Sequence, residues 1–455
     1  MATLDVTIVN LALPSIQRNF ALSNAGLAWV VDAYTLAYAG LLLVGGRCGD
    51  LVGHRRTLMI GIALFTVASL VAGFASDPAT LLAARAGQGL GAAFATPTTL
   101  SLITTLAPPG PARTRAMVAY GAMAGLGITL GLVLGGVLTQ YASWRWVFLI
   151  NVPIGLMLLV AAPRMLRESR GTRRRLDPAG ATVGTLALTS LVYGVIRAGS
   201  DGWGDPYSTT TLVAAVVLFV VFVMIERQVP EPTLPLRLLG NRTRLGAYFV
   251  AALLFACLYP SFFLLSRELQ DVEGHGPVNA GLRFLPLGAG VLIFAIVTRR
   301  VMASVGPRLL VLGGTLATTL GTLLLLLLDR DSTYAAVFLP SAIGLGAGVG
   351  TTFVANAALA MVEVDEQDAG IGSGLLSTFQ AVGGTIGIAV LASVAASATR
   401  AELTTASRPP DGELVKHALL TGFHLSFAIA GALALVAVLV AFVSAPGANT
   451  KTTRP

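Results

Sequence analysis

Long apolar segments separated by short polar segments repeat along the whole chain. They fall near residues 1–17, 27–46, 57–75, 79–106, 116–140, 146–163, 178–199, 209–227, 245–266, 279–298, 308–328, 334–361, 371–397 and 421–444. Each approaches or exceeds the roughly 20 residues that a helix needs to cross the hydrocarbon core of a bilayer. The pattern predicts an all-α polytopic membrane protein with fourteen transmembrane helices.

Composition supports lipid as the solvent for much of the surface. Charged residues make up 11% of the chain and hydrophobic residues 55%, whereas a typical soluble domain has roughly 25% charged residues. A soluble fold of this composition would lack the polar groups to cover its exterior. The 51 glycines fit this interpretation, because membrane helices pack closely through small residues.

The basic residues are distributed unevenly between the two sets of loops. With the N-terminus inside, the cytoplasmic segments carry 20 lysines and arginines and the outer segments carry 8. The positive-inside rule therefore predicts that both termini are cytoplasmic. The net charge of +8 then reflects membrane topology and does not indicate nucleic-acid binding. Cys48, Cys257 and the four scattered histidines form no ligand pattern, so we expect no metal and no cofactor.

Three short patterns recur in the same order and indicate a duplicated architecture. They are Arg47-x5-Gly53-x-Arg55 with Arg300-x5-Gly306-x-Arg308 at an offset of 253, Gly89-Leu-Gly91-Ala with Gly344-Leu-Gly346-Ala at 255, and Gly127-x3-Gly131 with Gly383-x3-Gly387 at 256. This offset exceeds the length of six helices, and two inserted helices would account for the surplus. We expect a six-helix bundle over 1–177, two inserted helices with a cytoplasmic linker over 178–240, and a second six-helix bundle over 241–455. Transporters with such repeats bind substrate between the halves, near the midplane.

Five motifs carry a resemblance to a known family. They are Leu4-Asp5-Val6-Thr7-Ile8-Val9-Asn10 through Pro14, Gly46-Arg47-Cys48-Gly49-Asp50 through Gly53, Arg55 and Arg56, Arg85-Ala86-Gly87-Gln88-Gly89, the glycines Gly127, Gly131, Gly135 and Gly136, and Trp144-Arg145-Trp146 through Asn151 and Pro153. Together they resemble the fourteen-helix drug:proton antiporters of the major facilitator superfamily, over nearly the whole chain. The resemblance implies two six-helix bundles plus two inserted helices, and multidrug or antibiotic efflux by alternating access.

The loop motif before the third helix contains Gly46, Arg47, Asp50, Gly53, Arg55 and Arg56. Asp50 lies just before that helix, where a carboxylate accepts hydrogen bonds from free backbone N–H groups. The three arginines can pair with carboxylates or carbonyls at neighbouring helix ends. The resemblance implies a cytoplasmic latch that forms and breaks during transport, and anchoring under the positive-inside rule is the alternative.

Charged residues inside the predicted spans are the candidate coupling groups. Arg85 lies inside the fourth span, where an arginine costs about 2.5–3.5 kcal/mol and needs a polar partner. Gln88 is one turn further on and shares its face. Asp5 and Asp32 lie in the first two spans, and burial favours the neutral form of a carboxyl group, so each is a candidate site for a proton or a cation. The alternatives are a structural hydrogen-bond hub for Arg85, a helix-start cap for Asp5 and an interfacial hydrogen bonder for Asp32.

The fifth predicted helix carries a stripe of small residues. Gly127, Gly131 and Gly135 recur every four residues, followed by Gly136, and predict close approach of a facing helix. The family usually has a proline after the middle glycine, where this chain has Leu132, so any role that needs a proline kink is in doubt.

Only four residues precede Asp5, which favours a start codon upstream of Met1. Glu226 is expected to be a solvated helix end.

The energy source follows from what the sequence lacks. Gly-Lys occurs nowhere, so a P-loop for ATP is absent and an ion gradient must drive transport. One proton moved down 100 mV supplies ~2.3 kcal/mol, enough for a roughly 50-fold substrate gradient.

We therefore predict a monomeric, proton-coupled exporter of hydrophobic or cationic drugs in a bacterial plasma membrane, whose partners are protons, a small-molecule substrate and lipid. The alternative is uptake or exchange of a small metabolite on the same fold. A membrane enzyme would need clustered histidine, cysteine or acidic groups, which the sequence does not offer.

Overall fold

The computed structural model describes residues 1–22, 24–107, 111–166, 168, 177–230, 232, 234–329, 332–365, 368–405 and 412–444. Its first half contains α1 (Ala2–Phe20), α2 (Asn24–Val52), α3 (His54–Gly73), α4 (Pro78–Leu106), α5 (Pro111–Tyr141), α6 (Trp146–Leu149) and α7 (Asn151–Met165). Next come α8 (Pro178–Asp201), α9 (Pro206–Gln228) and the short α10 (Arg237–Gly240). The rest consists of α11 (Arg242–Arg267), the π-helical turn η1 (Glu268–Val272), α12 (Pro277–Arg283), α13 (Leu285–Val305), α14 (Pro307–Leu324), the 3-10 turn η2 (Leu325–Leu327), α15 (Phe338–Ala360), α16 (Ala369–Thr405) and α17 (Gly412–Ser444).

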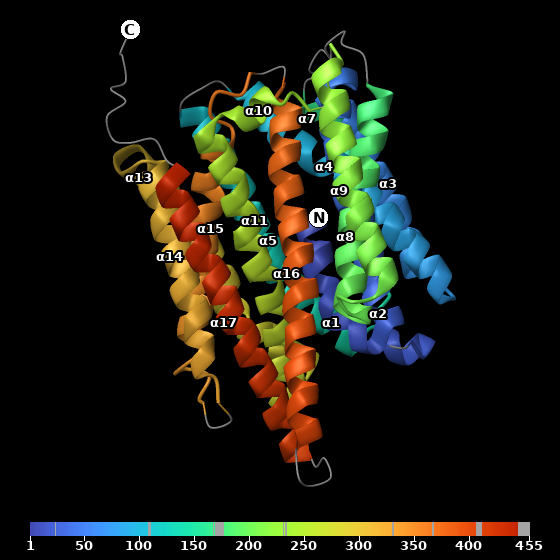
Figure 1. Ribbon diagram of the computed structural model, residues 1–455, viewed down its shortest axis with the longest axis vertical. Coiled ribbons are helices and arrows are strands. Elements are labelled where there is room, and N and C mark those ends of the chain that lie inside the picture. Colours follow the sequence, from blue (N-terminus) through green and yellow to red (C-terminus); the bar gives the residue numbers. More distant parts are fainter. Residues whose placement is uncertain are drawn as a thin grey trace.

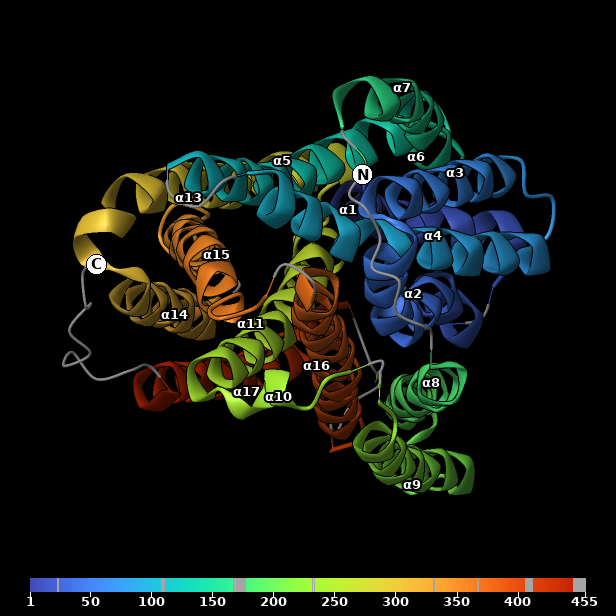
Figure 2. The same cartoon turned by 90° about the horizontal axis from the view of Figure 1, so that it is seen from above.

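The long helices run roughly parallel to one axis and form two groups (Figure 1). Seen from above, α1 to α4 lie on one side, and α13, α14, α15 and α17 lie on the other (Figure 2). In the first group α4 packs against α2 and α3, and in the second α15 packs against α13 and α14. The two groups therefore repeat one packing arrangement.

Helices α8 and α9 stand apart from this repeat. They pack against each other, and α8 also contacts α2 and α16, whereas α9 lies at the periphery (Figure 2). Large apolar side chains of α9 face outward, with Val216 64%, Phe219 51% and Met224 55% exposed. An exposed apolar face of this size suits contact with lipid.

Every predicted apolar segment coincides with one long helix or with two consecutive helical elements. Within the described residues, eleven helices are long and apolar enough to cross a membrane. The helices α1, α4 and α5, with 19, 29 and 31 residues, are not among these eleven. The all-helical membrane architecture is thus confirmed, and the count of fourteen crossings stays a prediction.

Asp-Pro pairs fix the starts of three helices. Asp77 accepts a hydrogen bond from the backbone N–H of Thr80 at 2.9 Å, ahead of Pro78 at the first turn of α4. The aspartates that precede α8 and α9 cap those helices in the same way. A capping carboxylate satisfies backbone N–H groups that have no partner within the helix, and proline is pre-organised for the first turn. The hydrogen bonds from the Thr80 side chain and backbone lower the pKa of Asp77.

The linkers between the second and third helices of the two groups have the same backbone conformation. Gly53 between α2 and α3 has φ 109°, and Gly306 between α13 and α14 has φ 82°. A side chain at either position would be strained, since this region of backbone space suits glycine. The glycines of the two matching loop patterns therefore occupy equivalent positions.

The match of Gly89-Leu-Gly91-Ala with Gly344-Leu-Gly346-Ala is two residues out of register with the helix contacts in the structure. Gly89 packs on α2 and Gly91 on α3, whereas Gly346 packs on α13 and Gly348 on α14. The equivalent residues are therefore separated by 257 positions in the sequence. The sequence match at an offset of 255 therefore does not pair structurally equivalent glycines, because Gly346 and Gly348 make the contacts that correspond to those of Gly89 and Gly91.

The glycine stripes on α5 and α16 face the first helix of their own group. A Cβ on Gly131 would lie 2.9 Å from the carbonyl oxygen of Leu4 in α1. A Cβ on Gly383 would lie 2.1 Å from the carbonyl oxygen of Ala252 in α11. The stripe in α5 thus lies against α1, and the stripe in α16 lies against α11.

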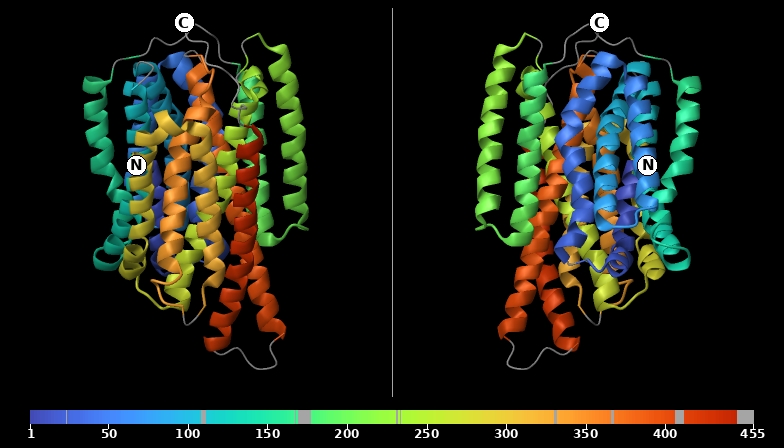
Figure 3. Two further views of the ribbon diagram at one scale, coloured as in Figure 1. Left: turned by 90° about the vertical axis from the view of Figure 1, so that its left-hand side faces the viewer. Right: turned by 90° about the vertical axis from the view of Figure 1, so that its right-hand side faces the viewer.

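Helices α16 and α17 extend beyond the other helices at one end (Figure 3). They have 37 and 33 residues, against about 20 for a single crossing. This end is opposite to the end where α17 finishes and where α2 meets α3. We call the end where α2 meets α3 the Asp50 end, and the end where α16 and α17 extend beyond the other helices the Glu268 end, after residues described below.

The structure contradicts the expectation that Glu226 is a solvated helix end. It is only 4% exposed, and its carboxylate accepts a hydrogen bond from the backbone N–H of Leu234 at 3.0 Å. Glu226, in the last turn of α9, is therefore buried against Leu234 and is not solvated.

The close packing of α16 on α11 gives a direct test. Gly383→Ala places a methyl group against backbone, which cannot move as a side chain can, so we expect a loss of about 1–3 kcal/mol in stability. The measurement is the thermal unfolding midpoint of the purified protein. Gly313→Ala is the matched control, because a Cβ on this helical glycine meets nothing within 4 Å. Equal midpoints for the two variants would contradict the packing described here.

Candidate functional site

A buried ion pair joins α1 to α4. The Arg85 Nη1 atom donates to Asp5 Oδ2 at 2.5 Å, and the two side chains are 1% and 0% exposed. The arginine predicted to need a polar partner thus finds it 80 residues away in sequence. Removing one partner of such a pair leaves an uncompensated buried charge and typically costs about 3–5 kcal/mol.

Three further polar side chains complete the network around Asp5. Asp5 Oδ1 accepts from Gln88 Nε2 and from Asn151 Nδ2, each at 3.0 Å. Gln88 also accepts from Arg85 at 2.9 Å and donates to Ser69 Oγ at 2.8 Å. One carboxylate therefore links α1, α4 and α7, and through Gln88 it is connected to α3.

Arg85 has a second set of contacts on α2. Its Nε atom donates to the Val30 carbonyl oxygen at 2.8 Å. Its guanidinium carbon lies 4.6 Å from the centre of the Tyr34 ring, within the range of a cation–π interaction. The guanidinium therefore stays anchored to α2 and to Gln88 even when Asp5 is neutral.

Asp32, predicted as a second coupling carboxylate, lies apart from this network. It is half-buried on α2, and within the described residues no hydrogen bond or ion pair involves its side chain. Its neighbour Trp29 packs against Tyr193 of α8, with ring centroids 6.0 Å apart. The structure thus brings together Asp5, Arg85 and Gln88 but not Asp32.

Aromatic side chains line the contact between the two helix groups. Tyr34 and Tyr38 of α2 stack with their ring centroids 5.7 Å apart. Tyr120 of α5 stacks on Phe353 of α15 at 5.7 Å, and this pair joins one group to the other. Rings of this kind offer apolar surface and can also bind a cation on their faces.

The loop motif joins the two groups at one end of the molecule. Asp50 accepts from the backbone N–H groups of Gly370 and Ile371, at 3.0 and 3.2 Å. Both belong to the first turn of α16, where free N–H groups and the helix dipole favour a negative charge. The N–H groups that Asp50 binds thus belong to α16, and its carboxylate also lies 3.6 Å from Nε2 of His54, the first residue of α3.

Small residues allow this approach between α2 and α16. A Cβ on Gly46 would lie 2.6 Å from the Gly370 carbonyl oxygen. Next to it, Ser101 of α4 and Ser373 of α16 lie with their hydroxyl oxygens 2.9 Å apart. The Asp50 end is therefore closed between the two groups.

The three arginines of the motif behave differently. Arg55 and Arg56 both face Glu168, with N–O distances of 3.3 and 3.6 Å. Arg56 is 67% exposed, so its ion pair adds little. Arg47 is only 1% exposed, and its Nε and Nη1 atoms have no acceptor within the described residues.

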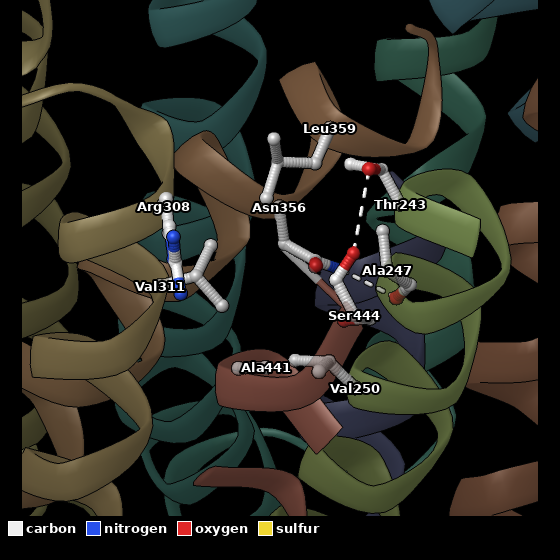
Figure 4. Close-up of a pocket in the computed structure, with 9 residues that line it drawn as sticks. All are labelled: Thr243, Ala247, Val250, Arg308, Val311, Asn356, Leu359, Ala441 and Ser444. Atoms are coloured by element: carbon white, nitrogen blue, oxygen red, sulfur yellow. Dashed lines mark hydrogen bonds between the residues drawn. The ribbon is translucent and has the colours of Figure 1, made fainter. Parts of the chain in front are cut away.

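A small pocket lies elsewhere, inside the second group (Figure 4). It is lined by residues of α11, α14, α15 and α17, among them Asn356, whose amide donates to the Ala247 carbonyl oxygen at 2.8 Å. The pocket does not lie between the two groups. It is therefore not a candidate for a passage across the membrane.

Sequence reasoning missed two residues of the central network. Asn151 stands within a quoted motif but received no role, and Ser69 lies in an apolar run without any motif. An amide at the start of a predicted span was a usable signal for Asn151, since buried polar side chains in membranes need partners. No such signal marks Ser69.

The fold and the buried ion pair define a class, that of helical membrane transporters built from repeated bundles. Residues 1–388 match the family described as the Major Facilitator Superfamily. The chain belongs to this superfamily.

Relatives of known name extend over most of the chain. It is 38% identical over 445 residues to the puromycin resistance protein pur8 of Streptomyces alboniger, covering 96% of this chain and 88% of the relative. It is 38% identical to the cephamycin export protein CmcT of Amycolatopsis lactamdurans, over 88% of this chain and 83% of that protein. The lincomycin resistance protein of Streptomyces lincolnensis is 39% identical, over 87% and 82%.

Solved structures share the fold. The human organic anion transporter MFSD10 (TETRAN) superposes with a TM-score of 0.65 at 16% sequence identity, covering 96% of each chain. A bacterial homologue of the human lysosomal transporter Spinster, in an inward-facing and occupied conformation, gives 0.62 at 17% identity, covering 97% of this chain and 93% of the other. At these identities the likeness concerns the fold alone.

A double-mutant cycle tests the buried ion pair. Asp5→Leu strands the Arg85 charge, and we expect it to lower the free energy of unfolding by about 3–5 kcal/mol. Asp5→Leu with Arg85→Leu should recover a large part of that loss, because two apolar groups replace the pair. Thermal and denaturant unfolding of the purified protein measures both, and additive effects in the double variant would exclude an interaction between the two residues.

Proposed function

We propose that this chain is a proton-coupled exporter of hydrophobic or cationic drugs or antibiotics that works by alternating access. Relatives named for puromycin resistance, lincomycin resistance and cephamycin export, 38–39% identical, support antibiotics as the substrate class. The aromatic contact between the helix groups offers apolar and cation-binding surface for such compounds.

The buried Asp5 carboxylate is the observation that carries proton coupling. As long as it is ionised, it holds α1, α4 and α7 together through Arg85, Gln88 and Asn151. A proton on Asp5 removes the charge that Arg85 balances and one acceptor oxygen that the amides use. Arg85 remains tied to Val30 and Gln88, so protonation loosens α1 against α4 and leaves the guanidinium in place.

The Asp50 contact supplies the alternating element. Opening this end requires Asp50 to leave the first turn of α16 and Ser101 to separate from Ser373. An anion at a helix N-terminus contributes about 0.3–2 kcal/mol, which is small enough to break in each cycle. Arg47, buried beside Asp50 with two donor atoms unsatisfied, would gain partners once the end opens.

The topology belongs to the same proposal. Helices α1, α4 and α5 would cross the membrane together with the eleven spans above, which makes fourteen. Two six-helix bundles over 1–177 and 241–455 would then flank the inserted helices and linker over 178–240. Both termini, with the Asp50 end, would face the cytoplasm of a bacterial cell, and the protein would act as a monomer.

Transport into everted membrane vesicles tests the function. With an imposed proton gradient we expect vesicles to accumulate puromycin, lincomycin or a cationic dye, and a protonophore to abolish the accumulation. Uptake of a small metabolite with no drug transport would favour the alternative reading of the fold.

Neutral variants test which carboxylate couples proton movement to drug transport. Asp5→Asn should lower gradient-driven drug accumulation by at least about tenfold, equivalent to ~1.4 kcal/mol, since the proton site is lost. Asp32→Asn is measured in parallel and combined with it. Asp201→Asn is the matched control, an aspartate 43% exposed at the end of α8 and paired with Arg197, and it should transport at the wild-type rate. Unchanged gradient-driven transport in the Asp5/Asp32 double variant would rule out this coupling scheme.

A reversible cross-link tests the opening of the Asp50 end. Ser101→Cys with Ser373→Cys, in a background with Cys48→Ala and Cys257→Ser, places two thiols where hydroxyls lie 2.9 Å apart. A disulfide of about 2.05 Å should form on oxidation and stop transport, and a reductant should restore it. The single-cysteine proteins control for oxidation itself. Full transport activity of the cross-linked protein would show that this end need not open.

A further inference from the structure

An acidic cluster lies at the Glu268 end, opposite Asp50 and away from the network around Asp5. Here α11 passes into the π-helical turn η1, which begins with Glu268. Such turns are rare and often mark functional sites. Glu268 was expected outside the ninth span, which was predicted to end at residue 266. The helix continues instead, and Glu268 is only 4% exposed.

One oxygen of the buried Glu268 carboxyl group has no donor among the described residues. Its Oε2 atom has no hydrogen-bond partner within the described residues. An ionised carboxylate in that position would be a buried charge with no direct ion pair among the described residues, which costs several kcal/mol. The backbone N–H of Glu273 donates to the Glu268 carbonyl oxygen at 3.0 Å across the π turn, which brings the two residues together, so a protonated Glu268 carboxyl group can donate to the Glu273 side chain. The geometry therefore fits the protonated form.

Glu273 is held ready to accept that hydrogen bond. Its Oε2 atom lies 2.8 Å from His275 Nε2 and 3.2 Å from Arg283 Nη1. The guanidinium carbon of Arg283 lies 4.9 Å from the centre of the Tyr334 ring, and Tyr334 donates to the Arg283 carbonyl oxygen at 2.8 Å. These contacts fix the Glu273 side chain from α12 and from the segment before α15.

The side chains around Glu268 also provide a route by which a proton can leave. The side chains of Glu273 and His275 are 29% and 24% exposed, whereas Glu268 is buried. A proton on Glu268 can pass to Glu273 and from there to His275 or to water. Within the described residues no set of histidine, cysteine and acidic side chains is arranged to hold a metal ion, so a proton is the ligand that fits.

We propose that Glu268 and Glu273 together bind one exchangeable proton, at a site distinct from Asp5. Binding of this proton goes beyond the proposed export function and does not depend on it. When the proton leaves, two carboxylates face each other, and among the described residues Arg283 and His275 are the basic side chains that contact Glu273. Repulsion between the two carboxylates then favours movement of the π turn, so this end of the second group responds to the medium that it faces.

Infrared spectroscopy of the purified protein in lipid nanodiscs tests the site without any transport. A pH titration should reveal a carbonyl stretch of a protonated carboxyl group that disappears as the pH rises. Glu268→Gln should remove this band. Asp5→Asn should leave it, and so should Asp271→Asn, the matched control, since Asp271 lies in the same turn with 43% exposure and pairs with Arg267 at 2.7 Å.

Glu273→Gln provides a second test in which the Glu268 carboxyl group remains. It removes the like charge, which favours ionisation of Glu268, so the band should disappear at a pH lower by about 1 unit or more. Persistence of the wild-type band in Glu268→Gln, or an unshifted titration in Glu273→Gln, would overturn the proposal. Because the spectrum does not require transport, a protein that exports no drug leaves this result intact. Likewise, loss of this site leaves the export proposal standing.

Discussion

A buried charge in a medium without water must find its counter-charge within the protein, and the first helix group is organised around that requirement. Asp5 and Arg85 form an ion pair, and the side-chain amides of Gln88 and Asn151 donate to the other carboxylate oxygen of Asp5. Because these side chains come from α1, α4 and α7, the relative rotation of three helices is fixed by one carboxyl group. A change in its charge is therefore felt by three helices at once.

Close backbone contact is the second constraint, and it operates mainly within each group. The stripes on α5 and α16 bring those helices against α1 and α11, with no room even for a methyl group at Gly383. Dispersion forces and the fit of small residues stabilise such contacts in lipid, where there is no hydrophobic drive between helices. Each group is consequently held along its whole length. This is the property that a bundle needs if it is to move as a rigid body.

The sequence predicted the elements well and the contacts between elements poorly. Apolar runs located every long helix, because spanning length is a local property of the chain. The need of Arg85 for a partner was predictable from its position, but the choice of Asp5, Asn151 and Ser69 depends on how α1, α7 and α3 are rotated, which apolar periodicity does not determine. Asp50 illustrates the same limit: its acidic character near a helix start was correctly noted, yet its partner is a helix 320 residues further along the chain. Glu268 was placed outside its span because a charged residue ends an apolar run, whereas the backbone continues through a π turn that turns the side chain inward.

Contacts within a helix group and contacts between the two groups differ in strength, and this difference suits a transporter. Within the first group, the Asp5–Arg85 pair would cost about 3–5 kcal/mol to break by removing one partner. Between the groups, the Asp50 end is held by a carboxylate at a helix N-terminus, worth about 0.3–2 kcal/mol, and by hydrogen bonds of Ser373 with Ser101 and with the Pro97 carbonyl oxygen. Arg47 reduces the net stability of that closure, because it is buried there with two donor atoms that find no acceptor in the part of the chain that the structure describes. The closed end therefore combines a modest attraction with a local penalty, so a proton or a bound molecule that changes the balance by a few kcal/mol is sufficient to shift the population. Strong contacts inside each group and weak ones between them thus give a molecule that changes shape mainly at the contact between its halves.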